Sequence, residues 1–183
     1  MKSLTSFAAG LAVVLFSAGL LSAGEVTVSG VHLCCGACVK AVGAALKDVA
    51  GVTNAACDSD AGTVKFTAAD EKSAAAGISA LAKAGFGGTA KDGDKSLAFP
   101  GSGVEKGKKV SMAQLKGIHL CCGGCYKAAE GALKGVNGVT AVKSDKADKT
   151  IWITGDNVDL QAALDALTAE GFHATVGVKV DQK

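Results

Sequence analysis

The chain repeats itself, and this repeat limits what it can fold into. Residues 31–41, with the sequence VHLCCGACVKA, recur at residues 118–128 as IHLCCGGCYKA. The two copies stay in register, with one deletion in the second, as far as a glycine-phenylalanine pair near the end of each: Gly85-Phe86 and Gly171-Phe172. A repeat of this length is too long for a solenoid unit. It therefore predicts two copies of one small domain.

The domain boundaries follow from the repeat. The first copy occupies residues 24–90 and the second residues 109–183. Residues 91–108 between them hold Pro100, the only proline, and several glycines. This composition is typical of a linker. We expect the linker to allow the two copies to move relative to each other.

The start of the chain, residues 1–23, has the pattern of a secretory signal peptide. Lys2 is followed by an apolar run, and small residues precede Gly24. We expect this segment to be cleaved, and the alternative is an uncleaved membrane anchor. After cleavage we expect an exported protein, periplasmic or secreted, without membrane contact, whose thiols face an oxidising environment.

The hydrophobic pattern changes in the same order in both copies. In the first copy it predicts strands at 26–33, 52–57 and 63–67, and a helix at 38–46. A second helix begins with Ser73 as its cap and ends near a glycine, and a last strand follows. The order βαββαβ predicts an α+β fold. Each copy is then a four-stranded antiparallel sheet with two helices on one face.

Six of the seven cysteines lie in two CCxxC sequences, and the seventh is Cys57. The CxxC pairs are Cys35 with Cys38 and Cys122 with Cys125, each where the first strand ends and a helix begins. Two thiols at this spacing can converge on one ion, and the amides at a helix start favour the thiolate. Thiolates select soft ions such as Cu(I) and Zn(II). Two sulfurs suffice for near-linear Cu(I) but fill only half of a zinc tetrahedron.

The remaining cysteines and the histidines allow more than one interpretation. Cys34 and Cys121 precede the CxxC pairs and either complete a three-sulfur site or point away, because neighbours in extended backbone face opposite sides. His32 and His119 occupy matching positions, where a structural or solvent-facing role is favoured over metal ligation. Cys57 has a serine in the other copy, and we expect it to act as a small buried hydrophobic residue.

Both copies resemble the heavy-metal-associated domain family, the ferredoxin-like copper chaperone and metal-transport modules. The resemblance is carried by the CCxxC motifs, by a glycine-valine pair after the first helix of each copy and by the late glycine-phenylalanine pairs. It implies two tandem ferredoxin-like domains, each binding a soft metal ion through its CxxC pair. It also implies that Phe86 and Phe172 lie near the sites. The family's usual Gly-Met-x-Cys-x-x-Cys differs here, because Leu33 and Leu120 replace the methionine.

We therefore expect an exported protein without catalytic activity that binds a soft metal ion in each CCxxC loop. Cu(I) is favoured, with Zn(II) and Hg(II) as alternatives. The expected role is metal buffering or delivery to a metal-transporting or metal-accepting protein. The alternatives are a thiol-disulfide redox protein that uses CxxC, or a secreted interaction protein stapled by disulfides. A net charge of +2 and the lack of arginine argue against nucleic acid as a partner.

Overall fold

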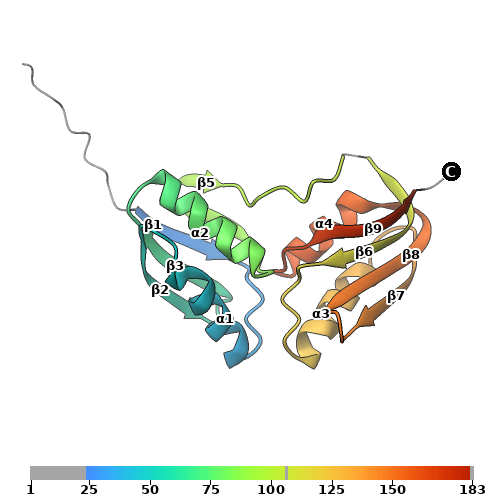
Figure 1. Cartoon of the computed structure of the whole chain (residues 1–183), viewed down its shortest axis with the longest axis horizontal. Coiled ribbons are helices and arrows are strands. Elements are labelled where there is room, and N and C mark those ends of the chain that lie inside the picture. The colour runs from blue at the N-terminus through green and yellow to red at the C-terminus, as the bar shows by residue number, and fades with distance from the viewer. Residues whose placement is uncertain (1–23, 106, 182–183) are drawn as a thin grey trace, which may run out of the picture.

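The computed structural model describes residues 24–105 and 107–181, so the predicted signal peptide lies outside the described residues. Figure 1 shows two domains side by side, each with its helices over one face of a sheet. The fold prediction of two tandem ferredoxin-like domains is confirmed. Within the described residues, no helix is both long enough and apolar enough to cross a membrane.

The first domain follows the βαββαβ order and adds one short strand. Its sheet is antiparallel, with the strand order β2-β3-β1-β4-β5. The elements are β1 (Gly24–Ser29), α1 (Gly36–Lys47), β2 (Val52–Asp58), β3 (Thr63–Ala68), α2 (Glu71–Lys83), β4 (Thr89–Asp92) and β5 (Lys95–Leu97).

The second domain has the same order without the added strand. Its antiparallel sheet has the strand order β7-β8-β6-β9. The elements are β6 (Lys109–Lys116), α3 (Gly123–Lys134), β7 (Val139–Asp145), β8 (Thr150–Asp159), α4 (Leu160–Ala169) and β9 (Thr175–Asp181).

Three details differ from the sequence-based expectation. The first strand ends at Ser29, and an irregular loop then leads to α1, which begins at Gly36. The N-cap of α2 is Asp70, whose side chain accepts a hydrogen bond from the backbone N–H of Ser73. Ser73 completes a capping box from the third helical position, because its hydroxyl accepts from the Asp70 N–H. Residues 91–97 of the expected linker lie in β4, β5 and the turn between them.

The helices and the inner sheet faces bury an apolar core in each domain. The two leucines that replace the family's methionine, Leu33 and Leu120, belong to these cores and are 6% and 3% exposed. Each leucine therefore fixes the loop that carries the cysteines to the domain interior. The largest fully buried side chains of the two cores include Phe66, Ile78, Leu81, Leu115, Ile153 and Leu167.

The two domains dock through backbone atoms at the ends of α2 and α4. The carbonyl of Gly171 accepts from the N–H groups of His32 and Gly87, at 3.3 and 3.0 Å. In the mirrored arrangement the carbonyl of Gly85 accepts from His119 and His173, also at 3.3 and 3.0 Å. The two copies are therefore in direct contact and related by an approximate two-fold arrangement.

Only glycine allows this approach. Gly85 and Gly171 have φ angles of +86° and +81°, in the left-handed region. A Cβ atom on Gly85 would lie 2.2 Å from the His119 amide nitrogen, and one on Gly171 would lie 2.2 Å from that of His32. The glycines before the two phenylalanines thus do more than end a helix, because they permit the domains to meet.

Candidate metal centre

The CCxxC loops connect the first strand of each domain to its first helix. Leu33 and Leu120 anchor the loops in the cores, and Cys35 and Cys122 are the N-caps of α1 and α3. Figure 1 shows that both loops lie at the junction of the domains and that the starts of α1 and α3 face each other across it. The two docked domains therefore bring the two cysteine motifs together.

Within each motif the predicted CxxC pairs converge. The sulfurs of Cys35 and Cys38 are 3.8 Å apart, and those of Cys122 and Cys125 are 3.7 Å apart. If an ion lies about 2.3 Å from each sulfur, as zinc does, sulfurs around a three-coordinate ion are about 4.0 Å apart and those around a tetrahedral ion about 3.8 Å apart. The spacing thus fits a shared soft metal ion.

The first cysteine of each motif faces the opposite domain. Cys34 lies 3.5 Å from both Cys122 and Cys125, as sulfur-sulfur distances. Cys121 lies 3.7 Å from Cys35 and 3.6 Å from Cys38. The six thiols form one cluster across the domain junction, which no local sequence pattern predicts.

The cluster runs from the protein interior to the surface. Cys38 and Cys125 are buried, Cys35 and Cys122 are half-buried, and Cys34 and Cys121 are exposed. All six are free thiols in this structure. Cys57 is also a free thiol, half-buried on β2 and packed against the core, as expected.

The loop backbone and burial shift the pKa values of the thiols in opposite directions. Hydrogen bonds from the backbone amides of Cys38 and Ala37 lower the pKa of Cys35. The Cys125 amide, followed by the thiol of Cys34, lowers the pKa of Cys122 to about 6. Burial raises the pKa of Cys38. The N-cap cysteines are therefore the preferred thiolates of the metal-free protein, as expected at a helix start.

Although Cys34 and Cys121 are exposed, partial desolvation among the packed thiols raises their pKa values, with further contributions from neighbouring thiols. Both side chains are surrounded by other sulfur atoms rather than by amide donors. Their thiolate forms thus lack the backbone support that Cys35 and Cys122 receive, and a bound cation would supply it.

The two histidines contact the opposite domain. The His32 ring stacks on Phe172 with centroids 4.3 Å apart, and His119 stacks on Phe86 at 4.4 Å. Burial lowers the pKa of both histidines. Both rings therefore pack at the domain junction. Phe86 and Phe172 are fully buried and pair with each other in an isolated β-bridge, so their main contacts are at the domain junction.

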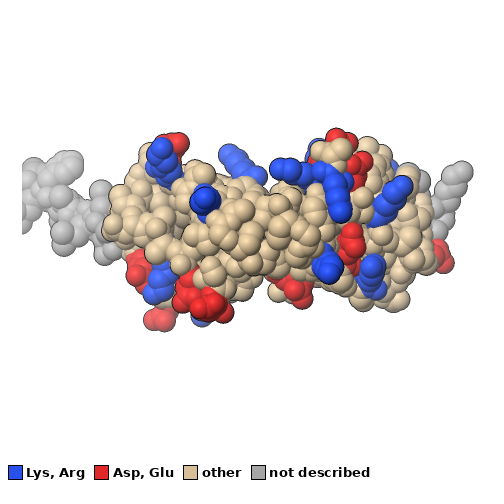
Figure 2. Space-filling view, turned by 90° about the horizontal axis from the view of Figure 1, so that it is seen from below, with Lys and Arg blue, Asp and Glu red and all other residues tan. Residues whose placement is uncertain are grey.

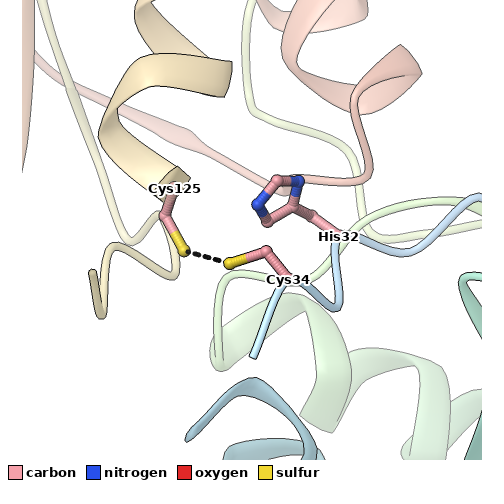
Figure 3. Close-up of side chains that lie close together, drawn as sticks. All are labelled: His32, Cys34 and Cys125. Carbon is pink, nitrogen blue, oxygen red and sulfur yellow. Dashed lines mark hydrogen bonds between the residues drawn. The ribbon is translucent and has the colours of Figure 1, made fainter. Parts of the chain in front are cut away.

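His32 also lies within reach of the thiols. One of its ring nitrogens and the sulfurs of Cys34 and Cys125 all lie within 4.8 Å of one another. Figure 3 shows these three side chains converging, with the dashed contact between Cys34 and Cys125. The Nε2 atoms of His32 and His119 are buried and have no hydrogen-bond partner among the residues that the structure describes. The His32 ring is thus a nitrogen donor beside an otherwise all-sulfur cluster.

Carboxylates take no part in the candidate ligand groups of the described residues, which consist of cysteines and His32. Figure 2 views the molecule from the side of the loops and shows lysines and acidic residues mixed near both ends. Uncharged residues fill the middle of that face, where the domains meet. The donor set suits a soft ion and disfavours hard cations, which require oxygen ligands.

The fold and the paired thiols at helix N-termini define a metal-binding module. Residues 25–87, which lie in the first domain, match the model of the heavy-metal-associated domain family. The second domain repeats the same fold and the same CCxxC motif outside the matched residues.

Two solved structures are similar to the chain. One is the apo form of the heavy-metal-associated domain of the copper chaperone for superoxide dismutase, with 20% identity, 48% of this chain and 90% of that chain covered, and a TM-score of 0.32. The other is the solution structure of the N-terminal soluble domains of Bacillus subtilis CopA, with 16% identity, 86% and 96% coverage, and a TM-score of 0.31. No curated protein matches the chain.

Proposed function

We propose that this chain is an exported protein that binds a soft metal ion, preferably Cu(I), through its two CCxxC loops and has no catalytic activity. Zn(II) and Hg(II) are the alternative ions. Its role is to buffer the metal or to deliver it to a metal-transporting or metal-accepting protein. The observation that carries the proposal is the cluster of six thiols at the two facing helix starts, with neighbouring sulfurs 3.5 to 3.9 Å apart.

The chemistry of the cluster supports both binding and release. Thiolates favour soft ions over the hard cations that oxygen ligands bind. Cys38 and Cys125 hold the buried side of the cluster, whereas Cys34 and Cys121 are exposed on its open side. A thiol of an acceptor protein can therefore approach the ion at the exposed cysteines and exchange with them.

The test is an anaerobic titration of the reduced protein with Cu(I) against a competing chelator. The double variant Cys35→Ser, Cys122→Ser removes one sulfur from each CxxC pair, and Cys57→Ser is the matched control. We expect the double variant to lose most of its affinity and the control to keep it. Equal affinity in all three proteins would exclude the proposed site. A parallel titration with Zn(II) establishes the preference between the ions.

Thiol-disulfide exchange is a second candidate function, supported by the lowered pKa values of the N-cap cysteines Cys35 and Cys122. A thiolate at the start of a helix is also the attacking group of redox CxxC motifs. This function predicts turnover in a disulfide-reduction assay without metal. We expect no turnover above that of the Cys35→Ser, Cys122→Ser variant.

Export is tested on the natural host. Cell fractionation followed by N-terminal sequencing should find the protein outside the cytoplasm, beginning at or near Gly24. Recovery of a chain that still carries residues 1–23 in the membrane fraction would instead support the uncleaved anchor.

A further inference from the structure

We propose that the two CCxxC loops form one shared, polynuclear thiolate site, in which the first cysteine of each loop ligates the ion held by the CxxC pair of the other domain. This inference rests on the proposed soft-metal function and specifies how its ligands are divided. The alternative is two separate sites, one in each domain. The two arrangements use the same six cysteines but connect them differently.

The sulfur-sulfur distances define two triangles that cross the domain junction. In one, Cys34 lies 3.5 Å from both Cys122 and Cys125, which are 3.7 Å apart. Each triangle takes two sulfurs from a CxxC pair and one from the facing loop. The edges of both triangles, 3.5 to 3.8 Å, are slightly shorter than the roughly 4.0 Å expected around a three-coordinate ion, so a bound soft ion would expand them slightly.

The second triangle mirrors the first. Cys121 lies 3.7 Å from Cys35 and 3.6 Å from Cys38, and these two are 3.8 Å apart. Within its own domain Cys34 contacts Cys38 at 3.9 Å, whereas across the junction it contacts both sulfurs of the opposite CxxC pair at 3.5 Å. The third sulfur for each pair is therefore available from the opposite domain.

Further contacts join the two triangles to each other. Cys121 lies 3.6 Å from Cys125 as well as 3.6 Å from Cys38, and Cys34 lies 3.9 Å from Cys38 and 3.5 Å from Cys125. These four sulfurs form a closed ring between the domains. Ions in the two triangles are therefore neighbours, and the ring sulfurs are placed to bridge them.

The domain contact holds the facing loops together. The N–H groups of His32 and His119, two residues before the first cysteine of each loop, donate to Gly171 and Gly85 of the opposite domain. The rings of the same histidines stack on the opposite phenylalanines. Each loop is thus fixed to the other domain beside its cysteines, which is the preorganisation a shared site requires.

Native mass spectrometry tests the sharing directly. The reduced protein is titrated with Cu(I) below saturation, and the numbers of ions bound per chain are counted. A shared site predicts that chains without metal coexist with chains holding two or more ions. The fraction of chains with one ion should be smaller than two independent sites would give. A statistical population of one-ion chains at half-loading would overturn the proposal.

The division of the ligands is tested with variants. The double variant Cys35→Ser, Cys38→Ser keeps only the CxxC pair of the second domain. Adding Cys34→Ser should weaken Cu(I) binding more than about tenfold, because loss of a ligand costs at least as much as loss of a second-shell partner. The matched control adds Cys57→Ser instead and should change nothing. Circular dichroism verifies that all variants are folded.

The outcomes separate this inference from the proposed function. If Cys34→Ser and Cys57→Ser have the same effect while the double variant still binds Cu(I), the shared site is wrong and soft-metal binding stands. If the unmodified protein does not bind Cu(I), both fail. X-ray absorption of the loaded protein gives an independent check, because we expect three sulfur ligands and a neighbouring metal ion. Two sulfurs with no metal neighbour would contradict the shared site.

Discussion

The cysteines of this chain differ in the pKa of their thiols, although their side chains are chemically identical. Cys122 receives backbone hydrogen bonds at the start of α3, which hold its pKa near 6. Cys57, packed against the core on β2, receives none of this support, and burial raises its pKa. The difference arises from the local backbone and can be measured in the metal-free protein.

We predict that Cys122 is alkylated much faster than Cys57 at neutral pH. A pKa lowered to about 6 means that Cys122 is mostly thiolate at pH 7, so its reaction rate should rise through about pH 6 and level off above about pH 7. The rate at Cys57 should keep rising above pH 9, because its pKa is raised. Iodoacetamide labelling with peptide mass spectrometry measures both in one sample, and equal pH profiles would contradict the assignment.

At this scale the sequence located the ligands but not their orientations. The spacing of the CxxC pairs predicted the convergence of Cys35 with Cys38 and of Cys122 with Cys125, because one helical turn brings such residues together. The direction of Cys34 depends on what lies opposite the loop. That is decided by the position of the second domain, and a local pattern carries no information about it.

Among the elements, α4 depends on a single side chain for its start. The Asp159 carboxylate accepts hydrogen bonds from the backbone N–H groups of Gln161 and Ala162, at 3.0 and 3.2 Å. It also accepts from Lys109 on the adjacent strand, at 3.0 Å. The Lys109 hydrogen bond, followed by those of the backbone amides, lowers the pKa of Asp159. This residue therefore joins a helix cap to the sheet.

We predict that Asp159→Ala lowers the free energy of unfolding by about 1 kcal/mol at pH 7, the usual cost of losing an N-cap. Because the folded-state pKa lies below the unfolded one, the contribution of the charge is present above about pH 4 and is lost as the pH falls through the folded-state pKa. Urea unfolding at pH 7 and pH 3 should show a smaller difference between wild type and Asp159→Ala at pH 3.

The conservative variant Asp159→Asn is the control for this prediction. It keeps an oxygen that accepts from the helix amides but removes the charge, so it should lose less stability than Asp159→Ala at pH 7. An equal loss in both variants would assign the effect to the ion pair with Lys109 rather than to the cap.

The order of elements was predictable because hydrophobic periodicity and glycines mark it in both copies. The errors lie where side chains compete for a role. Ser73 was expected as the cap of α2, but Asp70 three residues earlier takes it and uses Ser73 as its partner. The turn before β5 lies within residues 91–108, which the sequence predicts to be a linker because they hold Pro100 and several glycines. The two-residue loop between β4 and β5 is Gly93-Asp94, a glycine-aspartate pair that is also a hairpin signal, and Gly93 has a φ of +56°.

At the scale of the whole molecule, the docking of the domains can be removed by one methyl group. We predict that Gly171→Ala separates the domains, because its Cβ would meet the His32 backbone at 2.2 Å. Gly30→Ala is the matched control, since Gly30 has a similar φ of +74° but open space around its Cβ position. Both variants carry the strain of a left-handed backbone, and only Gly171→Ala also has the clash.

Small-angle X-ray scattering of the metal-free proteins measures the outcome. We expect a larger radius of gyration for Gly171→Ala than for Gly30→Ala, with the far-UV circular dichroism unchanged. Equal radii would show that the backbone contact does not hold the domains together. The docking itself could not be predicted from the sequence, because its hydrogen bonds join backbone groups that every residue carries.

Both halves of the cluster belong to one covalent chain, connected by residues 98–108 between β5 and β6. Two separate single-domain molecules would have to find each other, and their association would fail on dilution. A short tether instead keeps the loops at an effective concentration of about millimolar, whatever the amount of protein present. The number of ions bound per chain should therefore be the same at nanomolar and at micromolar protein. A protein built in this way would keep all six thiols of the cluster together even at low protein concentration.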